Sequence, residues 1–395
     1  MIKVRVCQWG FKEWWILFTA LVSSHKKAPE RLKDRLARYF HREIVLFNSG
    51  RAAIALCLQF VRQTKKGKTE VIIPRYICTS VIETIEKCGF QAIHAPVNDE
   101  LNLDITALPA FISDRTAAII APHMYSCSAD IEAIASLSRE KNIFLIDDAA
   151  QVFGVKHAGS LLGTFGNAGV LSFAQAKSIV TGIKGSGGAL LISDPELKRF
   201  VDDNVASYER NRVSFSRIVE FLCVYKWRGI FETAHYYLDR IKTLLQVNKP
   251  TDDYEPRKIA YLDAAIALRQ VDTFNQRYSQ TLQRLAIYQR ELSQLPFLSL
   301  PQIANETRYV SRFIVRLASE SPKAFRQYLK EHGVASKLTY LNGSKLYDGT
   351  ADSGLLELPL QDISTADVQK VCNVCQQYSK HLTDQEVVEN NNVTR

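Results

Sequence analysis

Short apolar runs alternate with helix-like segments between residues 44 and 195, and this alternation limits the possible folds more than any other feature. IVLF is followed by AAIALCLQFVR, and EVIIP is followed by TSVIETIEKCG. Strands that are so continuously apolar are typically buried on both faces, as in parallel sheets whose strands are joined by helices. The pattern predicts an α/β fold with a large, mostly parallel sheet that helices cover on both faces.

The alternation breaks down on both sides of this region, which divides the 395 residues into parts. Residues 1–43 form a basic, aromatic, helical segment. We predict a large α/β domain at 44–250, with a helical aromatic insertion at 205–250, and a smaller C-terminal α/β domain at 251–385. Residues 386–395 are polar and are expected to be disordered.

Positive charge is concentrated at the N-terminal end. The chain has a formal net charge of +9, and residues 1–43 hold ten Lys and Arg against four Asp and Glu. Such an end suits nucleic acid, an acidic membrane surface or a phosphorylated substrate. Because no helix-turn-helix, zinc-finger or RNP-like pattern accompanies it, nucleic acid is not expected as a partner.

The apolar run WWILFTALV (14–22) is too short to span a bilayer. Two interpretations remain open: a helix packed on the protein, or a Trp-bearing segment lying on a membrane surface. Peripheral membrane contact therefore stands beside a cytoplasmic location as an expectation.

Eight cysteines lie mostly inside apolar runs such as IALCLQF. This placement is typical of small buried side chains in a reducing compartment, which favours the cytoplasm. VCNVC (371–375) is the only C-x-x-C and has no second pair at zinc spacing, so we expect no metal site.

Several polar motifs follow predicted strands, at the sheet edge where ligands of α/β proteins bind. In FNSGRAAIAL (47–56) a strand turns at Gly50 into a helix whose first N–H groups could hold a phosphate. IFLIDDAAQ (143–151) ends a buried strand with two carboxylates, which are costly to bury without a cation or hydrogen-bond donors. An ordinary strand–helix turn and a helix N-cap are the alternative interpretations.

The third such motif is LSFAQAKSIVTGIKGSGGALL (171–191), which holds two lysines and a glycine cluster. Lys177 follows the apolar strand by a few residues, where an amine can lose its proton and attack a carbonyl. An exposed turn lysine is the alternative. Lys184 lies later, in GIKGSGG, and is interpreted as a loop residue.

Six motifs in the same order resemble the DegT/DnrJ/EryC1/StrS family of sugar aminotransferases over residues 30–385. They are NSGRAAI, VIIPRYICTSVIETIEKCGFQAI, IIAPHMYSCSADIEAI, LIDDAAQVFG, GVLSFAQAKSIVTGIKGSGGALL and LELPL. The resemblance implies the aspartate-aminotransferase-like fold (fold type I), pyridoxal 5'-phosphate (PLP) as cofactor, and a homodimer.

The resemblance also implies roles for individual residues. Lys177 would be the Schiff-base lysine and the acid/base that moves the proton, and Asp148 would pair with the ring nitrogen of PLP. Gln151 would hydrogen-bond near the ring 3-oxygen, and Ser172 would bind the phosphate.

The family's phosphate turn, usually Gly-Thr-Ala, is matched by Gly50, Arg51 and Ala52. Arg51 brings a guanidinium that can pair with phosphate through two hydrogen bonds.

The sequence departs from the family at three places. Cys78 stands where an aromatic ring usually stacks on PLP. Two alternatives are open: Tyr76 supplies the stacking, or the site uses a smaller contact. The N-Y-R-type motif that sends an Asn to the neighbouring subunit's phosphate is absent, as is the His of a late H-Y-P motif. His123 matches a frequent family histidine, but no catalytic role is assigned to it.

The implied activity is the transfer of an amino group from an amino acid to a nucleotide-linked keto-sugar, in the synthesis of polysaccharides or amino sugars. Glutamate is the expected amino donor. The alternative is a family member with lost or redirected catalysis that acts as a binding or assembly component, with the membrane surface as one location. Lys177 separates the two, because a lysine at this position favours PLP chemistry.

Overall fold

The computed structural model describes most of the chain: residues 1–4, 9–19, 25–182, 185–213, 254–300, 312–318, 322–338, 354–361 and 363–393. The predicted insertion at 205–250 lies outside them beyond residue 213, and Lys184 also lies outside them.

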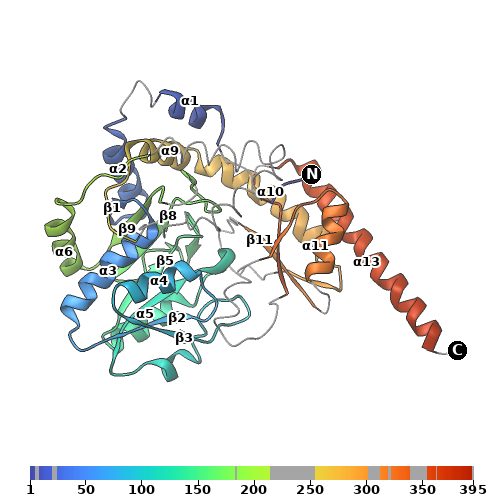
Figure 1. The fold of residues 1–395 in the computed structure, drawn as a ribbon, viewed down its shortest axis with the longest axis horizontal. Helices are drawn as coiled ribbons and strands as arrows, with labels where there is room; N and C mark the ends of the chain where they lie inside the picture. Colours follow the sequence, from blue (N-terminus) through green and yellow to red (C-terminus); the bar gives the residue numbers. More distant parts are fainter. Residues whose placement is uncertain are drawn as a thin grey trace, which may run out of the picture.

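A seven-stranded sheet forms the centre of the larger unit, in the order β1-β9-β8-β5-β4-β2-β3 (Figure 1). All neighbouring strands are parallel except the pairs that β9 makes with β1 and β8. The strands are β1 (Glu43–Phe47), β2 (Glu70–Pro74), β3 (Gln91–Ala95), β4 (Thr116–Pro122), β5 (Phe144–Asp148), β8 (Ala168–Ser172) and β9 (Gly188–Ile192). The expectation of a large, mostly parallel sheet is confirmed.

Helices cover both faces of this sheet, as predicted. One face packs against α3 (Gly50–Thr64), α4 (Thr79–Lys87) and α6 (Pro195–Val205) in one apolar core. The other face packs against α2 (Ala28–Phe40), α5 (Ile131–Glu140) and α9 (Tyr261–Asp272) in a second core. Strands β2, β4, β5, β8 and β9 place buried side chains in both cores, which explains their continuously apolar sequences.

The N-terminal segment forms two helices. In α2, Leu32, Leu36 and Phe40 recur at helical spacing and are almost completely buried in the core that α9 also contributes to. The shorter α1 (Phe11–Thr19) contacts α9 and lies at the edge of the molecule (Figure 1).

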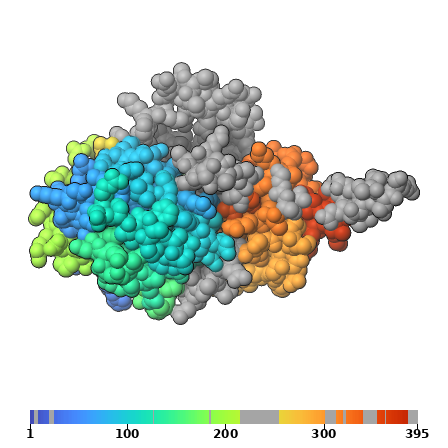
Figure 2. All heavy atoms as spheres, turned by 90° about the horizontal axis from the view of Figure 1, so that it is seen from below, coloured from blue at the N-terminus to red at the C-terminus, as the bar shows by residue number. Residues whose placement is uncertain are grey.

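The C-terminal unit is built on a four-stranded antiparallel sheet in the order β10-β11-β13-β12, and Figure 2 shows it beside the larger unit. Its strands are β10 (Leu298–Ser299), β11 (Phe313–Leu317), β12 (Lys337–Leu338) and β13 (Leu355–Leu358). Its helices are α10 (Phe274–Leu292), α11 (Pro322–Glu331) and α13 (Thr365–Val393). A short hairpin of β6 (Lys156–His157) and β7 (Ser160–Leu161) stands apart, in the larger unit.

Helix α13 corrects one expectation. It continues to Val393, so residues 386–393 are helical where the sequence predicts a disordered tail. A polar composition argues against a buried core but not against extension of a helix that is already nucleated, since adding a residue to a helix is much easier than starting one.

The C-x-x-C cysteines, Cys372 and Cys375, are buried in the apolar core of the C-terminal unit. Burial raises the pKa of Cys372 to about 12. Among the described residues, no group of His, Cys, Asp and Glu is arranged to hold a metal ion.

No helix in the described ranges has the length and apolarity required to cross a bilayer.

The burial of α2 can be tested by substitution. Leu36 is 0% exposed, so Leu36→Ala removes buried methyl groups and leaves a cavity. We expect a loss of about 2–5 kcal/mol in the free energy of unfolding, measured with urea. Exposed Lys33 on the same helix is the control, with Lys33→Ala expected to change stability by less than about 0.5 kcal/mol. Equal effects of the two would contradict the packing of α2.

Candidate active site

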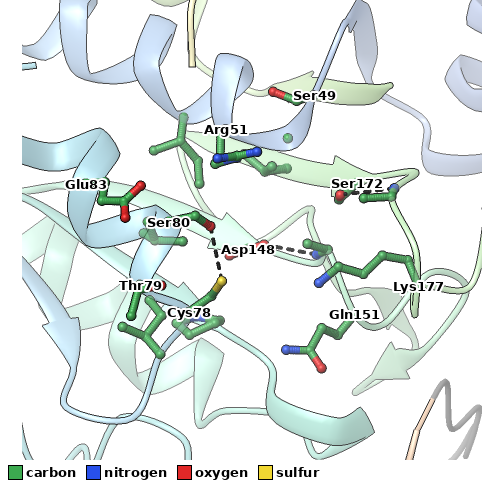
Figure 3. Close-up of a pocket in the computed structure, with 18 of the residues that line it drawn as sticks. Ser49, Arg51, Cys78, Thr79, Ser80, Glu83, Asp148, Gln151, Ser172 and Lys177 are labelled. Carbon is green, nitrogen blue, oxygen red and sulfur yellow. Dashed lines mark hydrogen bonds between the residues drawn. The ribbon is translucent and has the colours of Figure 1, made fainter. Parts of the chain in front are cut away.

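A cavity of about 340 Å³ opens at the carboxyl ends of β5 and β8, where it meets the start of α3 (Figure 3). Residues that follow the ends of five strands, β1, β2, β4, β5 and β8, line it, because parallel strands end at the same sheet edge. Its predicted site residues are Gly50, Arg51, Cys78, Asp148, Gln151, Ser172 and Lys177. Seven of the nine predicted cofactor-binding residues therefore line one cavity.

The start of α3 forms one wall. Ser49 is the N-cap, and its Oγ accepts a hydrogen bond from the N–H of Ala52 at 3.0 Å. Ala52 is fully buried and is not among the residues that line the cavity, so its place in a phosphate-binding turn stays a prediction. The N–H groups of Gly50 and Arg51 come first in the helix, where no helical acceptor exists.

The glycine cluster is explained by close packing. A Cβ on Gly188 would lie 2.4 Å from the backbone N of Gly50, so β9 can run beside the start of α3 only with glycine there. Gly185 and Gly187 line the cavity, and Gly187 has a φ of +130° that other residues rarely adopt.

The two carboxylates at the end of β5 have different surroundings. Asp147 Oδ2 accepts hydrogen bonds from the N–H groups of Gly163 at 2.8 Å and Phe165 at 3.0 Å. Its Oδ1 lies 2.7 Å from His123 Nε2. Both oxygens of Asp147 are thus engaged in hydrogen bonds with protein groups, which indicates a structural role.

His123 is held in one tautomer by the same network. Its Nδ1 accepts a hydrogen bond from the Ala129 N–H at 3.1 Å, so the proton lies on Nε2 and is donated to Asp147. His123 is 0% exposed, with both ring nitrogens engaged. These contacts favour a structural role, although the side chain borders the cavity.

Asp148 faces the cavity instead, and one oxygen accepts a hydrogen bond from the Ala150 N–H at 3.0 Å. Burial raises the pKa of the Asp148 carboxyl above its ordinary value, and Asp147 adds to the rise. The nearby Lys177 ammonium, the Ala150 hydrogen bond and His123 oppose it. A cation in the cavity would stabilise the charged form of this carboxylate.

Lys177 enters the cavity from the turn after β8, and Figure 3 shows its side chain extending toward Asp148 and Gln151. The residue before it, Ala176, has a φ of 59°. This left-handed conformation costs a non-glycine residue about 1–2 kcal/mol. Strain of this kind persists where the surrounding structure fixes the backbone, and here it sets the direction in which Lys177 leaves the chain.

Ser172 ends β8 and lines the cavity on the same side as Lys177 (Figure 3). Gln151 donates from Nε2 to the sulfur of Met124 at 3.6 Å, which holds its amide at the cavity wall.

The structure does not place Tyr76 among the residues that line the cavity, so its stacking on the cofactor stays a prediction. Its hydroxyl lies 2.8 Å from that of Tyr125, and the two rings meet edge to face. Both rings pack with Ile314 and Leu355 of the C-terminal unit. Cys78 does line the cavity, and its Sγ lies 3.1 Å from Ser80 Oγ.

Sequence reasoning missed three polar residues of α4 that also line the cavity: Thr79, Ser80 and Glu83. The signal was present, because α4 begins directly after the carboxyl end of β2, the position used to select the other motifs.

Comparison with known proteins agrees with this geometry. The sequence model of the DegT/DnrJ/EryC1/StrS aminotransferase family matches residues 19–214 and 254–376. The chain belongs to this family. The two matched ranges contain every predicted site residue.

Relatives of known name match parts of the chain. GDP-perosamine synthase from Vibrio cholerae is 26% identical over 209 residues, which is 52% of this chain and 55% of that protein. The chain thus matches about half the length of this relative.

Solved structures confirm the predicted fold. Helicobacter pylori PseC, an aminotransferase of pseudoaminic acid biosynthesis, has a TM-score of 0.74 at 15% identity and covers 96% of this chain and 99% of its own. GDP-4-keto-6-deoxy-D-mannose-3-dehydratase from E. coli, with bound hydrated PLP, has a TM-score of 0.72 at 17% identity and covers 95% and 100%.

The pKa of Asp148 predicts how pH acts on the cofactor-free protein. Burial raises this pKa above the value in the unfolded chain, about 3.9, so the folded chain binds the proton more tightly. Stability therefore falls as pH rises from about 4 through the folded pKa. We expect Asp148→Asn, which cannot ionise, to be more stable than the parent chain at pH 7, with the difference shrinking toward pH 4, by urea unfolding.

Asp147→Asn is the matched control. The two oxygens of Asp147 are held by the N–H groups of Gly163 and Phe165 and by His123, and an amide would turn an NH2 group toward at least one of these donors, so we expect a loss of about 3 kcal/mol at pH 7. If Asp148→Asn destabilised the cofactor-free protein as much as Asp147→Asn, the distinction between the two carboxylates would be refuted.

Proposed function

We propose that this chain is a PLP-dependent aminotransferase that transfers an amino group from an amino acid to a nucleotide-linked keto-sugar. Glutamate is the proposed amino donor. The observation that carries the proposal is the meeting of Lys177 and the buried Asp148 in one cavity that also borders the start of α3.

The residues present fit PLP at both of its ends. Asp148 is a buried carboxylate whose raised pKa indicates that it lacks sufficient positive charge nearby, and a protonated ring nitrogen would supply that charge. The first N–H groups of α3, the Arg51 guanidinium and the Ser172 hydroxyl form the opposite, anion-binding wall. We assign PLP's phosphate to this wall.

When bound, PLP supplies a pyridine ring that accepts electrons from the substrate carbon. Asp148 would hold a proton on the ring nitrogen, which increases that capacity. The Nζ of Lys177 would take a proton from one carbon and return it to another, as a general base and then a general acid. Gln151 would orient the ring from the side.

The substrate class rests on the family and on the name of a relative. The Vibrio cholerae relative is named as a GDP-perosamine synthase, and a nucleotide-linked sugar carries a diphosphate that the net charge of +9 suits. Glutamate as donor, and a homodimer as the active form, are part of the same proposal.

A binding or assembly component with lost catalysis is the second candidate, and the missing N-Y-R-type motif favours it. The two candidates differ in what Lys177 does, so one variant distinguishes them.

Lys177→Ala should abolish the first half-reaction. PLP-loaded protein is mixed with glutamate, and 2-oxoglutarate is counted per chain. We expect one equivalent from the parent chain and a rate at least about 100-fold lower from the variant, since general acid/base groups contribute 10²–10⁴-fold. Lys156→Ala, in the exposed β6 strand, is the control and should match the parent. A parent chain that takes up PLP but releases no keto acid from glutamate or from any other amino donor would favour the second candidate.

Arg51→Ala should weaken binding of PLP to the cofactor-free protein. Loss of a charge-assisted hydrogen bond to phosphate corresponds to about 10–100-fold in Kd. The measurement is a titration followed by PLP absorbance. Arg62, at the other end of α3, bonds the carbonyl of Cys88, and Arg62→Ala should leave Kd unchanged. An unchanged Kd for Arg51→Ala would remove Arg51 from the phosphate site.

A further inference from the structure

Helix α1 presents three aromatic or apolar side chains to solvent on one face. Phe11, Trp15 and Phe18 are 80%, 59% and 63% exposed, and their spacing of four and three residues places them in one stripe. Phe11 and Trp15 stack with ring centroids 6.2 Å apart. Large side chains this exposed, gathered on one helix, indicate an interaction surface.

The opposite face of α1 holds the helix on the protein. Trp9 Nε1 donates to the carbonyl of Val180 at 2.7 Å, and the rings of Trp9 and Trp14 meet edge to face at 5.0 Å. Leu17 is buried with Val180 and with Ile266 of α9. The exposed stripe is therefore displayed by an anchored helix.

Basic side chains lie beside the stripe. Lys12 of α1 and Lys26, Lys27 and Arg31 at the start of α2 are exposed. Among the described residues none of these four has an ion-pair partner, whereas Arg35, one turn further along α2, pairs with Asp272 at 3.0 Å.

A cavity of about 530 Å³ lies between these elements. Its floor is apolar, with Ile16 of α1 and Leu268 of α9, and basic groups surround it. His25, Lys26, Lys27, Arg31 and Arg269 contribute those groups, and Asp272 is its one acidic lining residue among those described. The buried atoms His25 Nε2 and Arg269 Nε have no hydrogen-bond partner within the described chain. The exposed cations that line this cavity, Lys26, Lys27 and Arg31, favour an anionic group.

The start of α2 strengthens this positive potential. Lys27 at the N-cap makes no side-chain cap hydrogen bond. The Ala28 N–H donates to the carbonyl of His25 at 2.9 Å and Pro29 has no N–H, so the N–H groups that this helix start can offer begin at Glu30. The positive end of the helix dipole then adds to the four exposed cations.

We propose that α1 and the start of α2 form a docking surface for an anionic lipid bilayer. Phe11, Trp15 and Phe18 enter the boundary between headgroups and acyl chains, and the basic cavity takes a lipid phosphate. Charge selects this occupant over a second copy of the same surface, because two such faces would bring like charges together. The surface is independent of the proposed amino transfer.

The test is flotation of the full chain with lipid vesicles at low salt. We expect binding to vesicles of phosphatidylglycerol and phosphatidylcholine, weak binding to phosphatidylcholine alone, and release at high salt. The double variant Trp15→Ser/Phe18→Ser should lower the partition constant at least tenfold, by loss of apolar contact. Lys26→Gln/Lys27→Gln should lower it about tenfold or more, since one basic residue near an anionic surface is worth about fivefold.

Lys323→Gln/Lys330→Gln is the control, because it removes the same charge from exposed positions of α11, in the C-terminal unit. It should leave the partition constant within about twofold of the parent value. Urea unfolding midpoints equal to the parent would show that the variants fold.

Three results would overturn the proposal. One is equal binding to anionic and neutral vesicles. Another is a control variant that loses binding as much as the Lys26/Lys27 variant. The third is a Trp15/Phe18 variant that converts a dimer to monomers while vesicle binding is unchanged, which would assign the stripe to contact between copies of the chain.

Discussion

The carboxylate of Asp147 is the interaction on which the rest of the site depends. It joins the end of β5 to His123 after β4 and to the turn at residues 163–165, which precedes β8. Three segments far apart in sequence are therefore fixed to one another by a side chain that never needs to meet a ligand. Because Asp147 and Asp148 are adjacent in a strand, their side chains point to opposite sides. Because Asp147 forms its hydrogen bonds with protein groups on one side of the strand, Asp148 faces the cavity on the other side.

Close backbone packing is the second constraint. The absence of a side chain at Gly188 lets β9 approach the start of α3, so that the helix N-terminus, the end of β8 and the cavity lie together. Lys177 depends on a related feature, since the left-handed Ala176 directs its side chain. The segment around Lys177 is rich in Gly and Ser, a composition typical of flexible loops, but close packing fixes the conformation of its backbone.

Much of the fold followed from the sequence because buried parallel strands and amphipathic helices have strong periodic patterns. The cavity residues followed because polar motifs at strand ends must converge at one sheet edge, as Asp148, Ser172 and Lys177 do. Ala52 and Tyr76 do not line the cavity, and no sequence pattern indicated this. Whether an N–H donates to the N-cap side chain, or a ring packs against a neighbouring unit, depends on contacts of a few ångströms that no local pattern contains. The extension of α13 was missed because polarity was taken as a sign of disorder.

The first residues of the chain make one more contact across the molecule. Ile2 pairs with the segment at 333–335, donating to the carbonyl of Gly333 and accepting from the N–H of Ala335, both at 2.8 Å. Since α1 and α2 pack on the larger unit, the chain begins in one unit and continues in the other. Residues 1–4 therefore add a non-covalent contact between the two units, beside the packing of Tyr76 and Tyr125 on the C-terminal unit and the covalent connection through α9 and α10. Removing Ile2 would take away one of these contacts, which links the freedom of the C-terminal unit to residues far from the cavity in sequence.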